Sequence, residues 1–300
     1  MGKMTSVLLL TTLLLSSCSN SGVNSNTAKG TNDTGNLPTA AETQASETAA
    51  PTVTPEVTVS PTPGVTANEA NTDTNTASKN ETAAEIPLLY HMNKNYDIVP
   101  NDEGTNKKVV LLTFDDGPKD AAMINPLMDI LDKHQAKAIF FVNGYRVKEN
   151  PDLLKLIHNR GGIIGNHSWE HIVLKDKSYT EVKKQIEDVQ NIVKDVIGEA
   201  PHFFRPPHGA GGDVGKKVAA ENGLLYMTWS VGSLDWEMKE KDTGKTDKLI
   251  NNVTDQLHSG SNILMHELPW TVEALDTLLT TLEGKGYSFV DPRSIELKMR

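Results

Sequence analysis

The 300-residue chain contains little cysteine, few aromatic residues and no long apolar run at its N-terminus. Its single cysteine, Cys18, excludes a disulfide within the chain. The first apolar stretch, residues 7–15, contains two threonines and is too short to span a hydrocarbon layer of about 30 Å comfortably. Lys3 precedes this stretch and small residues follow it. We therefore expect residues 1–18 to be a signal peptide.

The end of that segment, Leu15-Ser16-Ser17-Cys18, resembles a bacterial lipobox. The resemblance implies cleavage before Cys18 and a lipid on its thiol. An ordinary secretory signal with an incidental cysteine is the alternative. With the lipid, the mature protein would be an extracytoplasmic lipoprotein, anchored to the outer face of the bacterial cell membrane without spanning it.

Residues 19–86 have almost no aromatic side chains and are rich in Thr, Asn, Ala, Ser, Glu and Pro. Such a composition buries too little apolar surface to offset chain ordering, so we expect a disordered linker. Eight acids against two lysines place most of the chain's net charge of −10 in this segment. The remainder of the chain is only mildly acidic, which argues against a nucleic-acid partner.

From residue 87 to residue 300, short apolar runs alternate with helical periodicity, which indicates one α/β domain. Strands are predicted at 109–114, 138–142, 162–165, 202–204, 224–229, 262–265 and 287–290. Helices are predicted at 126–135, 151–159, 179–197, 214–222, 247–258 and 271–283. The alternation predicts parallel strands with crossover helices, in a barrel or a wound sheet. In both folds, functional sites form at the carboxyl ends of the strands.

Two adjacent carboxylates, Asp115 and Asp116, follow the apolar run of the first strand, and Gly117-Pro118 then ends it. Two acids at the end of a buried strand are costly unless a metal or a cation compensates them. The sequence therefore predicts a metal ion or a basic partner beside them.

His167 and His171 lie four residues apart, so both imidazoles can face one metal ion. This spacing also arises by chance, as an exposed or core-satisfied pair. With one of the two acids, the pair would form an Asp-His-His set that leaves positions open for water and substrate, as catalytic sites do. The mixed nitrogen and oxygen ligands favour zinc, with cobalt or iron as alternatives.

Arg205-Pro206-Pro207-His208-Gly209 follows another predicted strand. One interpretation is a rigid surface loop, because the prolines fix the backbone direction. The other is that Arg205 pairs with an acid of the site and that the rigid backbone directs an amide N–H at a developing oxyanion.

His266 ends the apolar strand at 262–265, and Asp235-Trp236 comes soon after the strand at 224–229. A histidine beside apolar residues is more often a core residue than a catalyst, but this one shares the predicted rim with the acids. Asp235 could hydrogen-bond His266 and keep it protonated as an acid. Trp236 provides either core packing or a flat face for a sugar.

Five stretches in this order resemble the five motifs of the polysaccharide deacetylases with NodB homology, carbohydrate esterase family 4. They are the stretches at 113–117, 167–171, 205–209, 235–236 and 263–266. The resemblance covers residues 87–297 and implies a distorted (β/α)7-type barrel that removes acetyl groups from polysaccharides with the help of a metal.

Within this resemblance, Asp115 is implied as the general base, and Asp116, His167 and His171 as the metal ligands. Arg205 would hold Asp115 ionised.

The backbone N–H of His208 would stabilise the oxyanion. His266 would be the general acid, with Asp235 as its partner, while Trp236 and Pro207 would contact the substrate. His208 stands where many members have tyrosine or phenylalanine.

The implied substrate is an N-acetylated polysaccharide, and an anchored enzyme meets cell-wall peptidoglycan first. Its N-acetylglucosamine or N-acetylmuramic acid units are both candidates, and a peptidoglycan deacetylase subgroup is one possible assignment. The alternatives are an extracellular glycan such as chitin, O-acetyl groups such as those of xylan, and glycan binding on an inactive deacetylase scaffold. We expect the protein to act as a monomer.

Overall fold

The structure, a computed structural model, describes residues 86–300. The predicted signal peptide, with Cys18, and the predicted linker up to residue 85 lie outside the described residues and remain predictions. The strands are β1 (Tyr90–Met92), β2 (Ile98–Pro100), β3 (Val109–Gly117), β4 (Ala138–Val142), β5 (Ile163–Asn166), β6 (Phe203–Phe204), β7 (Leu225–Tyr226), β8 (Val231–Gly232), β9 (Ser261–His266) and β10 (Ser288–Phe289). The α-helices are α1 (Ala121–Lys133), α2 (Gly144–Glu149), α3 (Pro151–Asn159), α4 (Tyr179–Ile197), α5 (Gly212–Glu221), α6 (Lys245–Gln256) and α7 (Pro269–Gly284), and the short 3₁₀ turns are η1 (Pro207–Gly209), η2 (Asp235–Glu237) and η3 (Pro292–Ser294).

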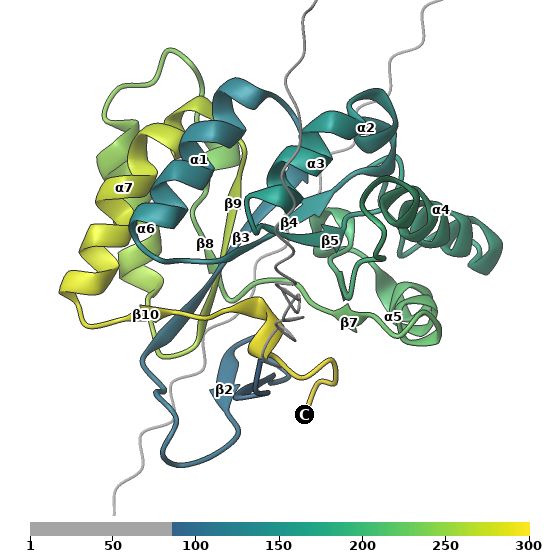
Figure 1. Cartoon of the computed structure of the whole chain (residues 1–300), viewed down its shortest axis with the longest axis horizontal. Coiled ribbons are helices and arrows are strands. Elements are labelled where there is room, and N and C mark those ends of the chain that lie inside the picture. The colour runs from purple at the N-terminus through teal and green to yellow at the C-terminus, as the bar shows by residue number, and fades with distance from the viewer. Residues whose placement is uncertain (1–85) are drawn as a thin grey trace, which may run out of the picture. The chain divides into compact units, whose positions relative to one another are not determined.

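A curled parallel sheet forms the centre of the domain (Figure 1). Its strands follow the order β7-β6-β5-β4-β3-β9-β8, and β10 pairs with the start of β3. Within residues 86–300 no pairing joins β7 to β8, so the sheet is an open half-barrel. The prediction of an α/β barrel with parallel strands is thus confirmed, and the barrel is open between β7 and β8, the two edge strands of the sheet.

The side chains of β3 and β4 alternate between two buried clusters. Val110, Leu112 and Phe114 belong to the cluster that also contains residues of α1, α6 and α7. Val109 and Leu111 belong to a second cluster on the inner face of the sheet. Because both faces are buried, the strand is apolar throughout, and periodicity could not show which side faces inward.

A short antiparallel hairpin covers the inner cluster at the end opposite the carboxyl ends of the strands. Tyr90, Met92 and Ile98 of β1 and β2 belong to this cluster, together with Ile295 of the C-terminal segment. Figure 1 shows β2 and the C-terminus side by side at this end of the domain. The hairpin gives residues 87–108 a structural role that the sequence did not indicate.

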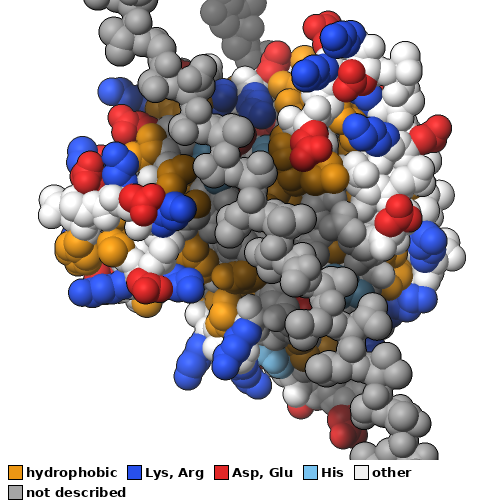
Figure 2. Space-filling view, turned by 180° about the vertical axis from the view of Figure 1, so that it is seen from behind, with side chains coloured by type: hydrophobic (Ala, Val, Ile, Leu, Met, Phe, Trp, Pro, Cys, Tyr) orange, Lys and Arg blue, Asp and Glu red, His pale blue; other side chains and the backbone are white. Residues whose placement is uncertain are grey.

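The helices surround the sheet, with α1, α6 and α7 grouped on one flank and α2 to α5 on the other (Figure 1). The long helix α4 starts with a capping box of Ser178 and Glu181, and it ends at Gly198, whose φ of 88° favours glycine. The described part of the chain contains no helix with the length and apolar character needed to cross a bilayer. On the face seen in Figure 2, acidic and basic side chains are interspersed.

The bounds of two predicted elements differ most from the structure, and two elements besides the hairpin were missed. The helix predicted at 126–135 begins at Ala121, because the side chain of Asp120 caps it by accepting from Ala122 N–H, and Pro126 lies inside it. Helix α2 and the two-residue strand β8 were not predicted. The strand predicted at 224–229 is reduced to β7, since the carbonyl of Thr228 accepts hydrogen bonds from Arg205 and Asn262 instead of extending the sheet.

Candidate active site

The carboxyl ends of four strands and the turn after β8 bring the predicted residues to one cavity of about 370 Å³. Its lining consists of acids, imidazoles, two indoles and one leucine: Asp115, Asp116, His167, His171, His208, Trp229, Trp236, Leu264 and His266. Arg205 and Asp235 are fully buried behind this lining. Residues that are 151 positions apart in the sequence therefore meet at one rim, as expected for parallel strands.

One acid and two imidazoles form a candidate metal centre. Single ligand atoms of Asp116, His167 and His171 all lie within 4.8 Å of one another. Oδ1 of Asp116 is 3.0 Å from Nε2 of His171 and 3.4 Å from Nε2 of His167.

The chemistry of this set fits a divalent cation. Nδ1 of His167 lies 2.7 Å from the carbonyl oxygen of Arg205, which can only accept, so Nδ1 carries the proton and Nε2 presents its lone pair to the centre. Oδ1 of Asp116 is buried without a hydrogen-bond partner among the described residues. A buried carboxylate oxygen without a donor is costly, and a cation would satisfy it.

The second carboxylate, Asp115, pairs with Arg205 rather than with the imidazoles. Nη1 of Arg205 donates to Oδ1 of Asp115 over 2.7 Å, and both side chains are buried. The guanidinium also donates to Thr113, Thr228 and Asn262, and it stacks 4.4 Å from the ring centre of Phe141. The buried guanidinium of Arg205 thus has hydrogen-bond partners on every side. The other carboxylate oxygen of Asp115, Oδ2, lies on the side of the cavity, 3.7 Å from Nε2 of His167.

His266 and Asp235 form the second charged pair of the site. Oδ1 of Asp235 lies 2.8 Å from Nδ1 of His266, and Oδ2 accepts from the backbone N–H of His266 and the hydroxyl of Thr271. Burial opposes the charged imidazole, yet the bond to Asp235 and the nearby acids raise the pKa of His266 above its ordinary value. The indole N–H of Trp270 donates to the backbone carbonyl of Asp235, which helps to hold Asp235 in place.

Aromatic rings form the wall around these groups. The ring of His208 packs 4.7 Å from that of His171, and His208 has a φ of 57°, which fits the rigid turn expected between Pro207 and Gly209. Trp236 is 40% exposed and packs edge-on 5.5 Å from the ring of His266.

Two wall residues, Trp229 and Leu264, were missed in the sequence because an indole and a leucine in apolar strands look like core residues. Gly232 leaves room for the indole of Trp236, since a Cβ at position 232 would lie 3.1 Å from Cη2 of Trp236. Pro207 differs from its prediction: it is buried and does not line the cavity, so its position supports the turn rather than a substrate contact.

Glu267 is a further buried acid beside the site that sequence reasoning missed. Its Oε2 accepts from the backbone N–H of Lys119 over 2.8 Å, and its Oε1 has no partner within the described residues. A Cβ on Gly117 would lie only 2.2 Å from Oε1, so glycine permits the close approach. Burial raises the pKa of Glu267 to about 7.

Comparisons with known proteins identify the family of the chain. The profile of the family described as "Polysaccharide deacetylase" matches residues 102–227. A peptidoglycan-N-acetylglucosamine deacetylase of Bacillus cereus is 37% identical over 190 residues, which are 62% of this chain and 67% of that protein. The chain belongs to the polysaccharide deacetylase family.

Other members of the family differ in length and in activity. The peptidoglycan-N-acetylglucosamine deacetylase PgdA of Listeria monocytogenes is 42% identical over 188 residues, which are 62% of this chain but only 38% of that protein. BA3943 of Bacillus anthracis, described as a CE4 family pseudoenzyme, matches with a TM-score of 0.59 and 32% identity over 65% of this chain and 67% of that one. Membership therefore does not by itself decide whether a chain is active.

Proposed function

We propose that this chain is a metal-dependent deacetylase that hydrolyses N-acetyl groups of cell-wall peptidoglycan. The observation that carries the proposal is the joint placement of an Asp-His-His cluster, a carboxylate paired with a buried arginine and a histidine paired with a buried acid around one cavity. The names of its peptidoglycan-deacetylating relatives support the choice of substrate.

Asp116, His167 and His171 would hold the cation, with zinc as the first candidate and cobalt or iron as alternatives. When bound, a divalent cation polarises an amide carbonyl and lowers the pKa of a coordinated water. Because Nδ1 of His167 donates to the Arg205 carbonyl, the ring is oriented so that Nε2 can bind a metal ion.

The protein's own groups would move two protons during hydrolysis. Asp115, which Arg205 holds in place, removes a proton from the attacking water. The backbone N–H of His208 in the rigid turn stabilises negative charge on the substrate oxygen. His266, held by Asp235, donates a proton to the leaving nitrogen, so that an amine rather than an amide anion departs.

The leading alternative within the same chemistry is hydrolysis of O-acetyl groups, since an ester passes through a similar tetrahedral state. The non-enzymatic alternative is a glycan-binding protein on an inactive scaffold, as the pseudoenzyme relative illustrates. It predicts loss of a base, a metal ligand or an acid, and all five such side chains are present and line the cavity: Asp115, Asp116, His167, His171 and His266. Attachment of a lipid to Cys18, and hence anchoring to the outer face of the membrane, belongs to the same proposal.

Acetate release from purified peptidoglycan and from chitin oligomers tests the proposal. The full chain is stripped of metal, assayed, and assayed again after zinc or cobalt is restored. We expect metal-dependent release from peptidoglycan that falls about 10³-fold in Asp115→Asn, because general bases contribute 10²–10⁴-fold. Reduction of the product, followed by sugar analysis, identifies the deacetylated unit as glucosamine or muramic acid.

No release from either polymer by folded, metal-loaded protein would contradict the proposal. Release from acetylated xylan alone would replace it with the esterase alternative. The matched control Asp120→Asn changes an exposed helix cap near the site and should leave acetate release unaffected.

A further inference from the structure

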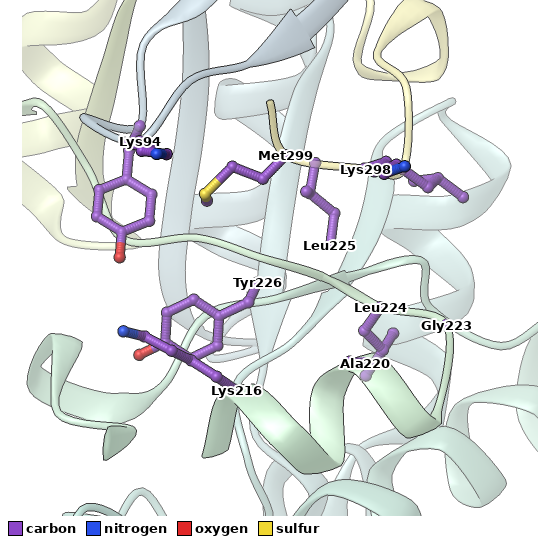
Figure 3. Close-up of a pocket in the computed structure, with 11 residues that line it drawn as sticks. Lys94, Lys216, Ala220, Gly223, Leu224, Leu225, Tyr226, Lys298 and Met299 are labelled. Carbon is purple, nitrogen blue, oxygen red and sulfur yellow. The ribbon is translucent and has the colours of Figure 1, made fainter. Parts of the chain in front are cut away.

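A second cavity, of about 610 Å³, lies where the turn of the β1–β2 hairpin and the C-terminal segment meet α5 and β7 (Figure 3). None of the residues that line the candidate active site lines this cavity. Its lining includes the apolar side chains of Leu225 and Met299 and the ring of Tyr226. Figure 3 shows Lys94 and Met299 on one side of the cavity, with Tyr226 and Lys216 on the other. We call it the basic pocket because of its lysines.

Three lysines from distant parts of the sequence line the basic pocket: Lys94 of the hairpin turn, Lys216 of α5 and Lys298 near the C-terminus. Its lining contains no acid. Some other lysines of the domain, such as Lys217 beside Glu221, lie near a carboxylate. Among residues 86–300, Lys94, Lys216 and Lys298 form no such pair.

The charge of the three lysines is opposite in sign to the net charge of the folded part of the chain. The folded part of the chain is mildly acidic, and the face in Figure 2 mixes both signs. Three like charges around one concave surface repel each other, and an anionic ligand would relieve that repulsion. The apolar floor would in addition bury small apolar groups of the same ligand. The complementary ligand is thus an extended chain that alternates carboxylates with small apolar side chains.

We propose that the basic pocket binds the acidic stem peptides of peptidoglycan. These peptides carry free carboxylates between alanine methyl groups, which match the cationic rim and the apolar floor. The inference rests on the proposed function, because it assumes that the glycan substrate is peptidoglycan. A lysine ammonium group is a mobile point charge, so it can follow a carboxylate without requiring one fixed geometry.

Peptide binding away from the catalytic cavity suits a cross-linked polymer. A glycan strand in the cavity and a peptide of the same network in the basic pocket could be held together, and the second contact then forms at a high effective concentration. The pocket would therefore increase retention on peptide-bearing wall and leave the reaction on short, peptide-free oligomers unchanged.

Co-sedimentation of the full chain with purified sacculi, freed of covalently attached polymers, tests the proposal. One arm uses sacculi with intact stem peptides, and the other uses glycan strands from which an amidase has removed the peptides. The variant carries Lys94→Glu, Lys216→Glu and Lys298→Glu. The matched control carries Lys107→Glu, Lys148→Glu and Lys194→Glu, three exposed lysines outside the pocket with the same change in net charge.

We expect the pocket variant to bind intact sacculi about tenfold more weakly than the matched control, since each exposed ion pair contributes a few-fold. The two variants should bind peptide-free strands equally and release acetate from N-acetylglucosamine oligomers like the parent. Equal binding of both variants to intact sacculi would overturn the inference, as would an equal loss on peptide-free strands. A defect that appears only when phosphate-rich wall polymers are left attached would also overturn it.

These outcomes separate the inference from the proposed function. Acetate release from oligomers with no peptide-dependent binding refutes only the basic pocket. Peptide-dependent binding without acetate release refutes only the deacetylase.

Discussion

The two ends of the inner surface of the sheet differ sharply although the same strands form both. At one end, which we call the apolar end, Val109 and Leu111 of β3 are covered by the hairpin and lie among apolar side chains. At the other end, which we call the polar end, Thr113 and Asp115 of the same strand and the same face bind Arg205. The difference shows how a complete set of partners stabilises a buried charge such as Arg205 in this interior.

Breaking the arginine pair at the polar end should have the largest effect on stability. Arg205→Met leaves Asp115 buried without its guanidinium, and we expect the free energy of unfolding to fall by about 4 kcal/mol. Chemical denaturation measures this change. Adding Asp115→Asn to the same chain should recover part of the stability but none of the acetate release. If the double variant is no more stable than Arg205→Met, the unpaired charge is not the cause of the loss.

Truncation at the apolar end should cost slightly less and act on stability alone. Leu111→Ala removes a fully buried side chain beneath the hairpin, and we expect a loss of about 3 kcal/mol. Because the site lies at the opposite end of the strand, kcat per folded molecule should stay unchanged. A fall in kcat at temperatures where the variant is fully folded would show that the two ends are coupled.

The residues at the polar end could largely be predicted from the sequence, because Asp and His are the residue types that bind metals and transfer protons. The residue types of Asp116, His167 and His171 indicate candidate metal ligands, and the βα alternation predicts that the carboxyl ends of the strands meet. The hairpin was not predictable, since strands of three residues such as Tyr90–Met92 show no usable period.

The contacts of Glu267 could not be read from the sequence either. It binds the backbone N–H of Lys119, 148 positions away, and any residue except proline offers such a group. The orientation of Leu264 was also hidden, because both faces of β9 are buried and its apolar residues look alike.

Glu267 differs from Arg205 because one of its buried oxygens has no hydrogen-bond partner among residues 86–300, as is also true of Asp116. Its folded pKa of about 7 lies above its ordinary value of 4.5, so the folded state favours the protonated carboxyl. Stability from this group is therefore complete below pH 4.5 and is lost as the pH rises to about 7. The loss amounts to roughly 2–3 kcal/mol for a group this deeply buried.

Glu267→Gln removes the titration and retains an acceptor for Lys119 N–H. We expect the metal-free variant to be more stable than the parent at pH 8 and similar to it at pH 4.5, as measured by denaturation at each pH. Glu267→Ala, which loses the acceptor, should be less stable than Glu267→Gln at every pH. A parent whose stability is flat between pH 4.5 and 7 would contradict the assignment.

The pair of His266 and Asp235 should show the smallest effect, visible in the pH profile of kcat. Asp235 raises the pKa of His266, so the protonated acid persists to higher pH than an ordinary imidazole would. Asp235→Asn removes that influence, so the basic limb of the profile should move to lower pH and kcat on that limb should fall.

Thr271→Val is the matched control for this change. It deletes only the hydroxyl that donates to Oδ2 of Asp235, over 2.7 Å, and leaves Oδ1 beside Nδ1 of His266. The control should therefore move the limb by much less than Asp235→Asn. An unmoved limb in Asp235→Asn would mean that another group donates the proton, because removing the charge nearest to His266 cannot leave its titration unchanged.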